Sequence, residues 1–517
     1  MPKDIDEMGD RDVLPDNVAA HGSIQWNAIV RMGAYGISVA INIMAVPFII
    51  RGLGIEAYGV IGIINTFIAY MSIITISLTS TIGRNLTIAI EKKEFELASK
   101  EVSTAIYGLL AVICVLLVPL FILSYYIDDL IVMPSRLVNE ARILFVLLVL
   151  AFVANSLAGV IGAGMFARNR LDLFSLAALS KTIVFVVCIV SWFSVLEPNI
   201  TAYGGSILGS SIFLFIIHAV IYRKLLPGIE ITRKNFDSGV LLGIFSLGVW
   251  MLVNQLGGLL FLQTDLIVAN HILGSSATGK LAALLVIPLQ LRVLAGLVSG
   301  LFAPAQVAMS VDTGSSSFGN YLLRSVRLTT LFMALLVGVF CGSASEILGV
   351  WLGEEYSELA PIAIVLTAYL VPTLGLLPCW NALLAVGKVK WPAVVTLTMG
   401  GGNVVLAVFL AEKMEMGLMG IALAGCIMLS LRNIIFTPWY VSRVCDIKFT
   451  GLIYELGVGV VFACVVCLTS SMIMTFFQPD TISMLIVSLV ISGVCGGLIL
   501  APIVLRSIKG KEQRETI

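Results

Sequence analysis

The stretch LLAVICVLLVPLFIL, residues 109–123, contains no charged side chain and no alternation of apolar and polar positions. A strand with one wet face would alternate, and so would each strand of a membrane barrel. The mainly apolar run around it covers residues 102–127. About 20 apolar residues are enough for a helix to cross a bilayer. This stretch therefore predicts a transmembrane helix.

The whole chain repeats this pattern. It has 517 residues, of which 59% are hydrophobic and only 12% charged, whereas soluble domains are about 25% charged. Backbone groups in lipid must bond to one another, which favours helices. We expect an all-α integral membrane protein with about 14 transmembrane helices. The expected spans are 26–50, 57–83, 102–127, 142–166, 171–196, 200–222, 241–267, 279–308, 321–345, 360–386, 392–411, 417–441, 451–475 and 482–505.

Basic residues in the loops predict the orientation. With a cytoplasmic N-terminus, the outside loops hold only Arg51, Arg136 and Lys413, with Arg142 and Lys280 at their borders. Most other loop Lys and Arg residues then lie inside, Arg324 and Arg327 among them, as the positive-inside rule requires. The polar N-terminal segment has no basic region joined to an apolar core, so it does not resemble a cleaved signal peptide. We expect a multi-pass plasma membrane protein with both termini in the cytoplasm.

Three short phrases occur twice. LGIEAYG (53–59) returns as LGSSATG (273–279), and the basic pair at 168 and 170 returns at 388 and 390, both with an offset of 220 residues. YGGSILGS (203–210) returns as MGIALAGC (419–426), with an offset of 216. Six spans form an even number, so both halves would point the same way across the membrane. The repeats predict two six-helix lobes related by a pseudo-twofold axis along the membrane normal.

This reading predicts an organisation in six parts. They are a cytoplasmic N-terminal segment (1–25), an N-terminal six-helix lobe (26–222), a cytoplasmic inter-lobe linker (223–238), a C-terminal six-helix lobe (239–443), two additional transmembrane helices (451–505) and a cytoplasmic tail (506–517).

Four basic residues lie within the expected spans: Arg31, Lys181, Arg292 and Arg432. A charge at the centre of a membrane helix costs about 2.5–3.5 kcal/mol on the translocon scale, so such residues normally face a partner or a wet cavity. Arg31 is close enough to the inner end of its helix to reach the headgroups, and a role in a cationic cavity is an equal alternative for it. For the other three, a cationic cavity that binds an anionic substrate is the leading hypothesis, and a structural ion pair is the alternative. Guanidinium groups bind phosphate oxygens in bidentate fashion.

Other polar residues lie deep in the second half. Asp265 could pair with a cation or a helix end, bind a coupling ion, or reach the outer interface, and we expect the last of these. Asn403 is a candidate ion or sugar ligand, although such residues more often bond between helices. Asn254 and Gln255 complete this set of candidate coupling-ion or polar-cavity residues.

Sequence signals of catalysis are missing. There is no Walker A sequence, no HExxH, no GxSxG and no Rossmann fingerprint beside a strand. Cys464 and Cys467 form a CxxC in the middle of a span, where small packing residues are expected more often than a metal site. We expect no enzymatic activity, no cofactor, no metal site and no nucleic-acid partner.

The first hairpin, PFIIRGLGIEAYGVIGIINTFIAYMSII (47–74), resembles the opening hairpin of Wzx-type polysaccharide flippases, which belong to the multidrug/oligosaccharidyl-lipid/polysaccharide exporter superfamily. QTDLIVANHILGSSATG (263–279) is similar to the second-half counterpart of that hairpin, with Asp265 where the family often has Asp. As motif, the likeness covers only these two hairpins.

The resemblance implies two lobes around a cavity that opens to one side at a time. It implies movement of a polyprenyl-pyrophosphate-linked oligosaccharide, an O-antigen or exopolysaccharide unit, from the inner to the outer leaflet of the bacterial inner membrane. Candidate partners are the bilayer, polysaccharide polymerase or assembly proteins, and H+ or Na+ as coupling ion. The alternatives are a lipid II flippase, a multidrug extruder of the same fold, and a membrane glycosyltransferase.

Overall fold

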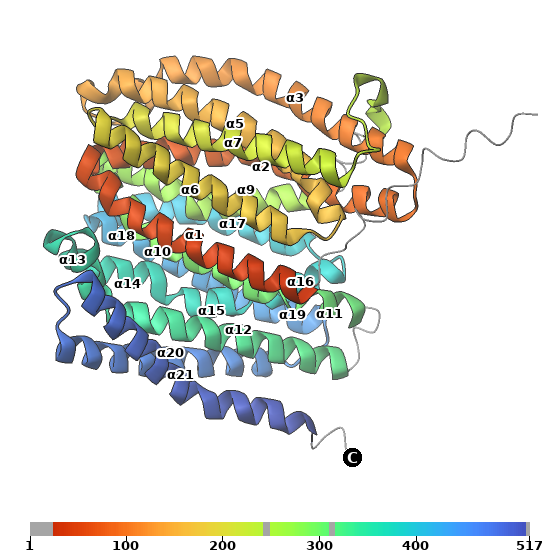
Figure 1. Ribbon diagram of the computed structural model, residues 1–517. Helices are drawn as coiled ribbons and strands as arrows, with labels where there is room; N and C mark the ends of the chain where they lie inside the picture. Colours follow the sequence, from red (N-terminus) through yellow and green to blue (C-terminus); the bar gives the residue numbers. More distant parts are fainter. Residues whose placement is uncertain (1–23, 241–248, 310–315, 513–517) are drawn as a thin grey trace, which may run out of the picture. The chain divides into compact units, whose positions relative to one another are not determined.

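The computed structural model describes residues 24–240, 249–309 and 316–512, and every regular element within these residues is a helix (Figure 1). The described residues divide into two compact units, a first unit up to Leu256 and a second unit from Gly257. The first 23 residues and residues 513–517, which belong to the expected terminal segments, lie outside the described ranges.

The elements bounded within the described residues of the first unit are six long helices and three short ones. They are α1 (Ile24–Leu53), α2 (Ile55–Glu91), α3 (Phe95–Tyr125), α4 (Ile127–Leu130), η2 (Ser135–Leu137), α5 (Val138–Ala167), α6 (Leu171–Val195), α7 (Ile200–Leu225) and η3 (Arg233–Asn235). Helix α9 (Val249–Leu262) runs across the division between the units.

The second unit has more, and shorter, helical segments. They are α10 (Thr264–Gly300), α11 (Ala303–Met309), α12 (Ser316–Gly342), α13 (Ala344–Leu352), η5 (Glu354–Leu359), α14 (Ala360–Ala368), α15 (Leu370–Gly375), α16 (Leu377–Ala385), α17 (Lys390–Val408), η6 (Phe409–Lys413), α18 (Gly417–Ser430), η7 (Leu431–Phe436), α19 (Thr437–Val444), α20 (Phe449–Phe477) and α21 (Ile482–Glu512). Both η6 and η7 are π-helical.

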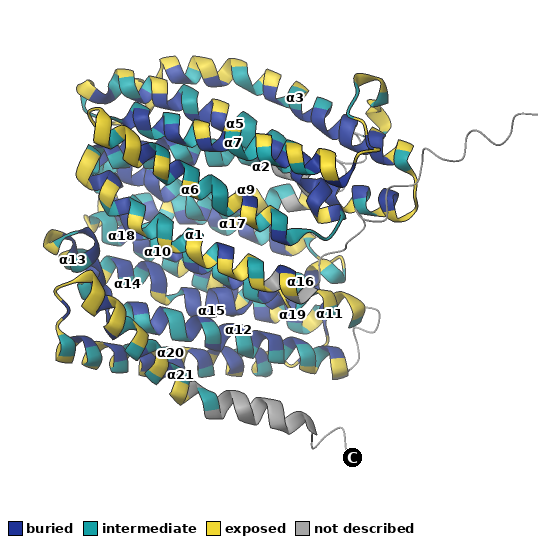
Figure 2. Cartoon of the chain, in the orientation of Figure 1, coloured by how far each residue is buried: buried dark blue, intermediate teal, exposed yellow. Residues whose placement is uncertain are grey.

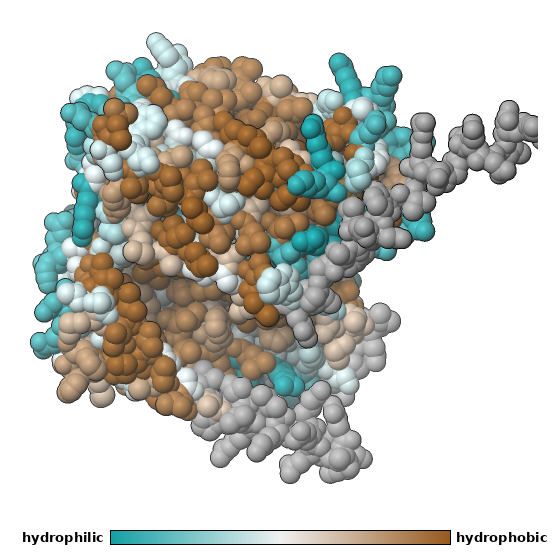
Figure 3. Space-filling view, viewed as in Figure 1, coloured by the Kyte–Doolittle hydropathy of each residue, from teal (hydrophilic) through white to brown (hydrophobic). Residues whose placement is uncertain are grey.

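Within the described residues, 13 helices are long and apolar enough to cross a membrane. One of them, Leu252–Gly300, has 49 residues and would be about 74 Å long if straight, far more than a hydrocarbon core of about 30 Å. Its backbone leaves the helical region at Gly274, so its two arms cross separately. Counting both arms gives the fourteen crossings that the sequence predicts. In the upper part of Figure 3, the first unit shows apolar side chains between hydrophilic ends.

The repeated Leu-Gly phrase forms the same corner in both units. Gly54 separates α1 from α2 with φ 85° and ψ 160°, and Gly274 bends α10 with φ 84° and ψ −179°. This backbone region is essentially restricted to glycine. The phrase therefore recurs because each of these hairpins needs glycine, the residue that readily adopts this backbone conformation.

The other repeated phrases have similar, but not identical, local structures in the two units. A left-handed residue ends the helix after the fourth crossing at Asn169 (φ 52°) and after the tenth at Gly387 (φ 69°). In both turns the next residue donates its N–H to a carbonyl five residues earlier, at 2.8 and 2.9 Å. The two left-handed residues are 218 residues apart, whereas the basic pairs are 220 apart, so the basic residues hold slightly different positions in the two turns. Gly204 and Gly420 both allow close packing, but against different helices.

Packing within each unit centres on a few helices. In the first unit α5 contacts α2, α3 and α7, while α1 packs on α6. In the second unit α12 contacts α15, α20 and α21. Figure 2 shows buried residues along α5 and α12, whereas α3 and α21 carry many exposed ones. The exposed side chains of the peripheral helices are largely apolar, which suits contact with acyl chains.

The chain that follows α7 lies against α3. The backbone N–H groups of Thr232 and Asp237 donate to the hydroxyls of Ser103 (3.2 Å) and Thr104 (3.0 Å), and Ser99 accepts from Glu230 (3.3 Å). These bonds satisfy backbone groups that have no helical partner. They attach the expected linker to the N-terminal part of α3.

Candidate functional site

Arg292 of α10 lies beside Tyr369, which caps α14. One guanidinium nitrogen of Arg292 donates to the Tyr369 hydroxyl at 2.9 Å, and its Cζ lies 5.8 Å from the centroid of the same ring. The described part of the chain contains no carboxylate within salt-bridge distance of this arginine. The positive charge is therefore oriented by an aromatic neighbour and not neutralised by an ion pair.

Arg432 belongs to the π-helical segment η7 and lies near enough to Arg292 for the two charges to repel each other. Its Nε atom is buried and has no hydrogen-bond partner. Counted from Gly417 and from Val444, it is about 23 and 18 Å along the helical segments, which places it near the membrane centre. A π-helical turn inside an α-helix is frequent at functional sites.

The position of Asp265 differs from our expectation. We expected it to reach the outer interface, but it is 5% exposed and lies nine residues before the corner at Gly274, about 14 Å along the helix. The helix is locally distorted next to it, at the single residue Gln263 between α9, which ends at Leu262, and α10, which begins at Thr264. Broken helices near the midplane are a common way to build ion and substrate sites in transporters.

Asn403 of α17 is the neighbour of this carboxylate. Its amide nitrogen donates to Asp265 Oδ1 at 3.1 Å, which is the interhelical bond we considered, while its own Oδ1 is buried without a partner. That oxygen and Asp265 Oδ2 both approach Gly425 of α18. Two oxygen acceptors therefore lie at a position where α10, α17 and α18 meet, and Arg292 is within electrostatic range of Asp265.

In the first unit, Lys181 of α6 has a neutral partner. Its Nζ donates to Asn155 Oδ1 of α5 at 2.8 Å, and the Asn155 amide donates to Ser211 of α7 at 2.9 Å. Lys181 is about 15 Å along α6 from Leu171, close to the membrane centre. Among the residues that the structure places, no carboxylate forms a salt bridge with it.

The remaining expected site residues are less enclosed. Arg31 is exposed on α1, and Gln255 is exposed on α9. Asn254 is partly buried and has interactions of its own. The structure thus brings Arg292, Arg432, Asp265 and Asn403 into one region of the second unit, and it places Lys181 in a separate polar cluster of the first.

Two exposed ion pairs lie near the helix ends of the first unit. Arg142 donates to Asp128 at 2.8 Å, and this hydrogen bond lowers the pKa of the Asp128 carboxyl. Arg136 pairs with Glu56 at 2.9 Å. Such exposed pairs are worth little for stability, and they offer no site.

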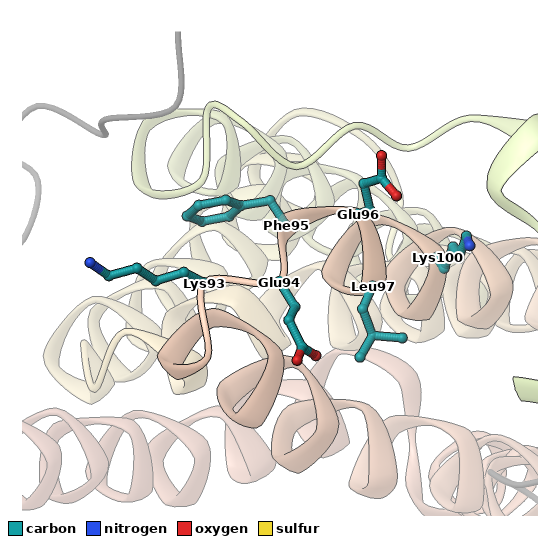
Figure 4. Close-up of a pocket in the computed structure, with 6 residues that line it drawn as sticks. All are labelled: Lys93, Glu94, Phe95, Glu96, Leu97 and Lys100. Atoms are coloured by element: carbon teal, nitrogen blue, oxygen red, sulfur yellow. The ribbon is translucent and has the colours of Figure 1, made fainter. Parts of the chain in front are cut away.

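A hollow of about 540 Å³ lies at the turn between α2 and α3. Figure 4 shows that its side chains, among them Lys93, Glu96 and Lys100, point in different directions. Because the groups do not converge and carry both signs of charge, this hollow has none of the features of an anion site.

Two features escaped sequence reasoning. Tyr369 gave no signal, because a single tyrosine in a long apolar run marks no particular site. Arg327, which we assigned to an inside segment, lies within α12, and this assignment is wrong because the helix begins eleven residues earlier, at Ser316. Its guanidinium forms two hydrogen bonds with Glu455 of α20, one of 2.6 Å. The sequence did offer a signal for this pair, since Arg327 lies near one end of an expected span and Glu455 lies near one end of another.

The comparisons with known proteins agree with this architecture. The sequence profile described as "Polysaccharide biosynthesis protein" matches residues 25–295, more than half of the chain. The uncharacterized membrane protein EpsK of Bacillus subtilis (strain 168) is 34% identical over 445 residues, 85% of this chain and 88% of EpsK. The chain belongs to the polysaccharide biosynthesis protein family.

The chain is also similar to two further proteins. A putative O-antigen transporter of Shigella flexneri is 23% identical over 440 residues, covering 82% of this chain and 99% of that protein. The solved structure of the lipid II flippase MurJ, in an inward closed conformation, superposes with a TM-score of 0.69 at 17% identity, over 94% of this chain and 100% of MurJ. At that identity the structural likeness shows the fold alone.

Proposed function

We propose that this family member is a flippase that moves a polyprenyl-pyrophosphate-linked oligosaccharide from the inner to the outer leaflet by alternating access between two lobes. The family's description and the name of the Shigella flexneri relative point to polysaccharide export. The fold shared with a lipid II flippase supports a lipid-linked cargo.

The observation that carries the proposal is the pair Arg292 and Arg432. Two arginines near the membrane centre, close enough to repel each other and without a salt-bridge partner among the described residues, are costly to keep. An anion bound between them would offset that cost. Guanidinium donors match the paired oxygens of a pyrophosphate, so the anion gains charge-assisted hydrogen bonds as it loses water.

Lys181 would provide an anion contact of its own in the first lobe. Its ammonium group has three donors, and Asn155 uses one of them. In this scheme Arg31, exposed on α1, contacts headgroups or the arriving cargo. The inside-negative membrane potential drives an anion outward by about 2.3 kcal/mol per charge per 100 mV.

Asp265 and Asn403 are our candidates for the coupling ion. A carboxylate and an amide oxygen beside a helix distortion suit either Na+ or a proton carried by the carboxyl group. Because Arg292 is within electrostatic range of Asp265, neutralising the carboxylate would leave the arginine freer to bind an anion. We place Asn254 and Gln255 at the margin of this site.

The basic bias of the expected inside loops supports a bacterial inner membrane location with both termini in the cytoplasm. We keep the division into a 26–222 lobe, a 223–238 linker, a 239–443 lobe and two additional helices as part of the proposal. Polysaccharide polymerase and assembly proteins would act on the delivered unit.

The test uses vesicles reconstituted with the full chain and a fluorescent lipid-linked oligosaccharide. Wild-type protein should accelerate leaflet exchange, while Arg292→Ala and Lys181→Ala should slow it by about tenfold or more without loss of insertion, since each removes a charge-assisted contact. Lys224→Ala, at an exposed basic position near the inner end of α7, is the matched control.

Several outcomes would reject the proposal or favour one of the alternatives. Full activity in both charge variants would reject the cationic site. Exchange of lipid II in preference to other lipid-linked sugars would favour the precursor flippase, and export of organic cations would favour a multidrug extruder. Transfer of sugar to an acceptor would indicate a glycosyltransferase. Cells that lack the protein should accumulate lipid-linked repeat units inside, and normal levels would contradict the proposal.

A further inference from the structure

The inner part of the helical segments η7 and α19 carries a continuous row of aromatic rings. Phe436 and Tyr440 are stacked, with ring centroids 5.5 Å apart and planes 13° from parallel, and Trp439 lies 6.2 Å from Phe436. Trp439 is 46% exposed. We call these three residues the aromatic ladder.

Each end of the ladder carries a cation. Arg443, exposed, places its Cζ 5.1 Å from the Trp439 ring centroid. Arg432, one helical turn before Phe436, has a buried Nε without a partner. Eleven residues separate the two arginines, about 16 Å along the helix, which is half the thickness of a hydrocarbon core. The row therefore reaches from the inner membrane surface to the middle.

A belt of interfacial aromatics would explain only part of this arrangement. Belt residues lie at headgroup level, and Trp439 and Tyr440 could serve there. Phe436, however, lies three and four residues before them, about 5–6 Å deeper along the helix. A place at the interface does not explain this phenylalanine. Its contacts with Trp439 and Tyr440 connect those two rings with the segment that holds Arg432.

The chemistry of the ladder fits a glycan attached to a pyrophosphate. The faces of a sugar ring present C–H groups, which are weakly positive, and an aromatic face is negative. Stacking of this kind tolerates different sugars because it needs no specific hydroxyl pattern. The flanking guanidinium groups suit the phosphate oxygens. An uncharged lipid would use neither arginine, and a bare phosphate would not use the rings.

We propose that the aromatic ladder is the cytoplasmic binding path for the glycan of the lipid-linked substrate, with Arg443 receiving the pyrophosphate at the surface and Arg432 receiving it at the membrane centre. The inference rests on the proposed flippase function and adds a specific subsite to it. The Tyr440 hydroxyl donates to the backbone oxygen of Lys388 (3.4 Å), which holds this ring in place beside the α16–α17 turn.

The experiment compares two fluorescent probes in vesicles that hold the full chain. One is a polyprenyl pyrophosphate that carries an oligosaccharide, and the other is the same lipid without sugars. Phe436→Leu, Trp439→Leu and Tyr440→Leu should each slow exchange of the first probe by about tenfold and leave the second at the wild-type rate, since an aromatic stack is worth about that factor. Arg443→Gln should slow both probes.

Trp391→Leu is the matched control, because this tryptophan is 58% exposed at the start of α17 and makes no ring contact with the ladder among the described contacts. Equal slowing of both probes by the leucine variants would overturn the inference, as would unchanged exchange of the glycan probe or an equal effect of the control. If wild-type vesicles move neither probe, the flippase proposal itself fails, and the ladder's role fails with it. Elution of each variant as a single detergent-soluble species excludes misfolding.

Discussion

The ion pair between Arg327 of α12 and Glu455 of α20 allows a quantitative test of how the two C-terminal helices are attached. The Glu455 side chain is 6% exposed and the Arg327 side chain 33% exposed, and two hydrogen bonds join them. Both residues lie in helical segments within the membrane. We expect the two single substitutions to differ in cost because the partners differ in exposure.

Arg327→Met leaves a buried carboxylate without its partner, and the loss of one member of a buried pair costs about 3–5 kcal/mol. Glu455→Gln leaves an arginine that is one-third exposed and can turn toward water, so we expect only about 1–2 kcal/mol. The double variant Arg327→Met with Glu455→Leu replaces both charges by apolar groups. It should be within about 1 kcal/mol of wild type, as is often found for such replacements.

The measurement is reversible chemical unfolding in mixed micelles, followed by circular dichroism, for the single variants, the double variant and wild type. Arg324→Met, one turn earlier on α12, is the control and should change the free energy of unfolding by less than about 1 kcal/mol. The reasoning is refuted if the effects of the single substitutions simply add in the double variant, because independent sites are additive and a coupled pair is not.

Two other expectations concern the corner glycines and an exposed ion pair. Gly54→Ala and Gly274→Ala should each lower the free energy of unfolding by about 1–3 kcal/mol, because alanine is strained at φ near 85°. Gly33→Ala, in an open helical position, should leave it unchanged. Equal effects of all three substitutions would contradict the corner geometry. Arg142 holds the pKa of Asp128 below its unfolded value, so the stabilisation is complete above the unfolded pKa of about 3.9 and disappears as pH falls through the lower folded pKa. The unfolding difference between wild type and Asp128→Asn, measured from pH 6 downward, should therefore shrink on acidification, and a constant difference would count against the pair.

The helices could be predicted because their signal is local. A charge-free run such as residues 109–123 specifies a transmembrane helix without reference to any other part of the chain. The repeated phrase identified the positions of Gly54 and Gly274, although only the structure shows the shared backbone conformation that requires glycine there.

The site was predicted less completely because its geometry depends on distant residues. The distortion beside Asp265 occurs without proline or glycine, so nothing in the local sequence separates it from a helix that continues to the outer interface. The π-helical turn at Arg432 likewise has no pattern of its own. Tyr369 contributes through its position relative to Arg292, which is 77 residues earlier in the chain.

The seam between α12 and α20 has a consequence for protein engineering. A methyl group added at Gly342 would lie 2.2 Å from a backbone oxygen of α20, and one added at Gly459 would lie 2.2 Å from Thr330. Deleting everything after residue 448, to mimic a twelve-helix transporter, would therefore expose a groove that is shaped for a helix. It would also remove Glu455 and leave Arg327 without its partner in the hydrocarbon region. A shortened version or a chimera should be designed with bulkier residues along α12 and a neutral side chain at position 327.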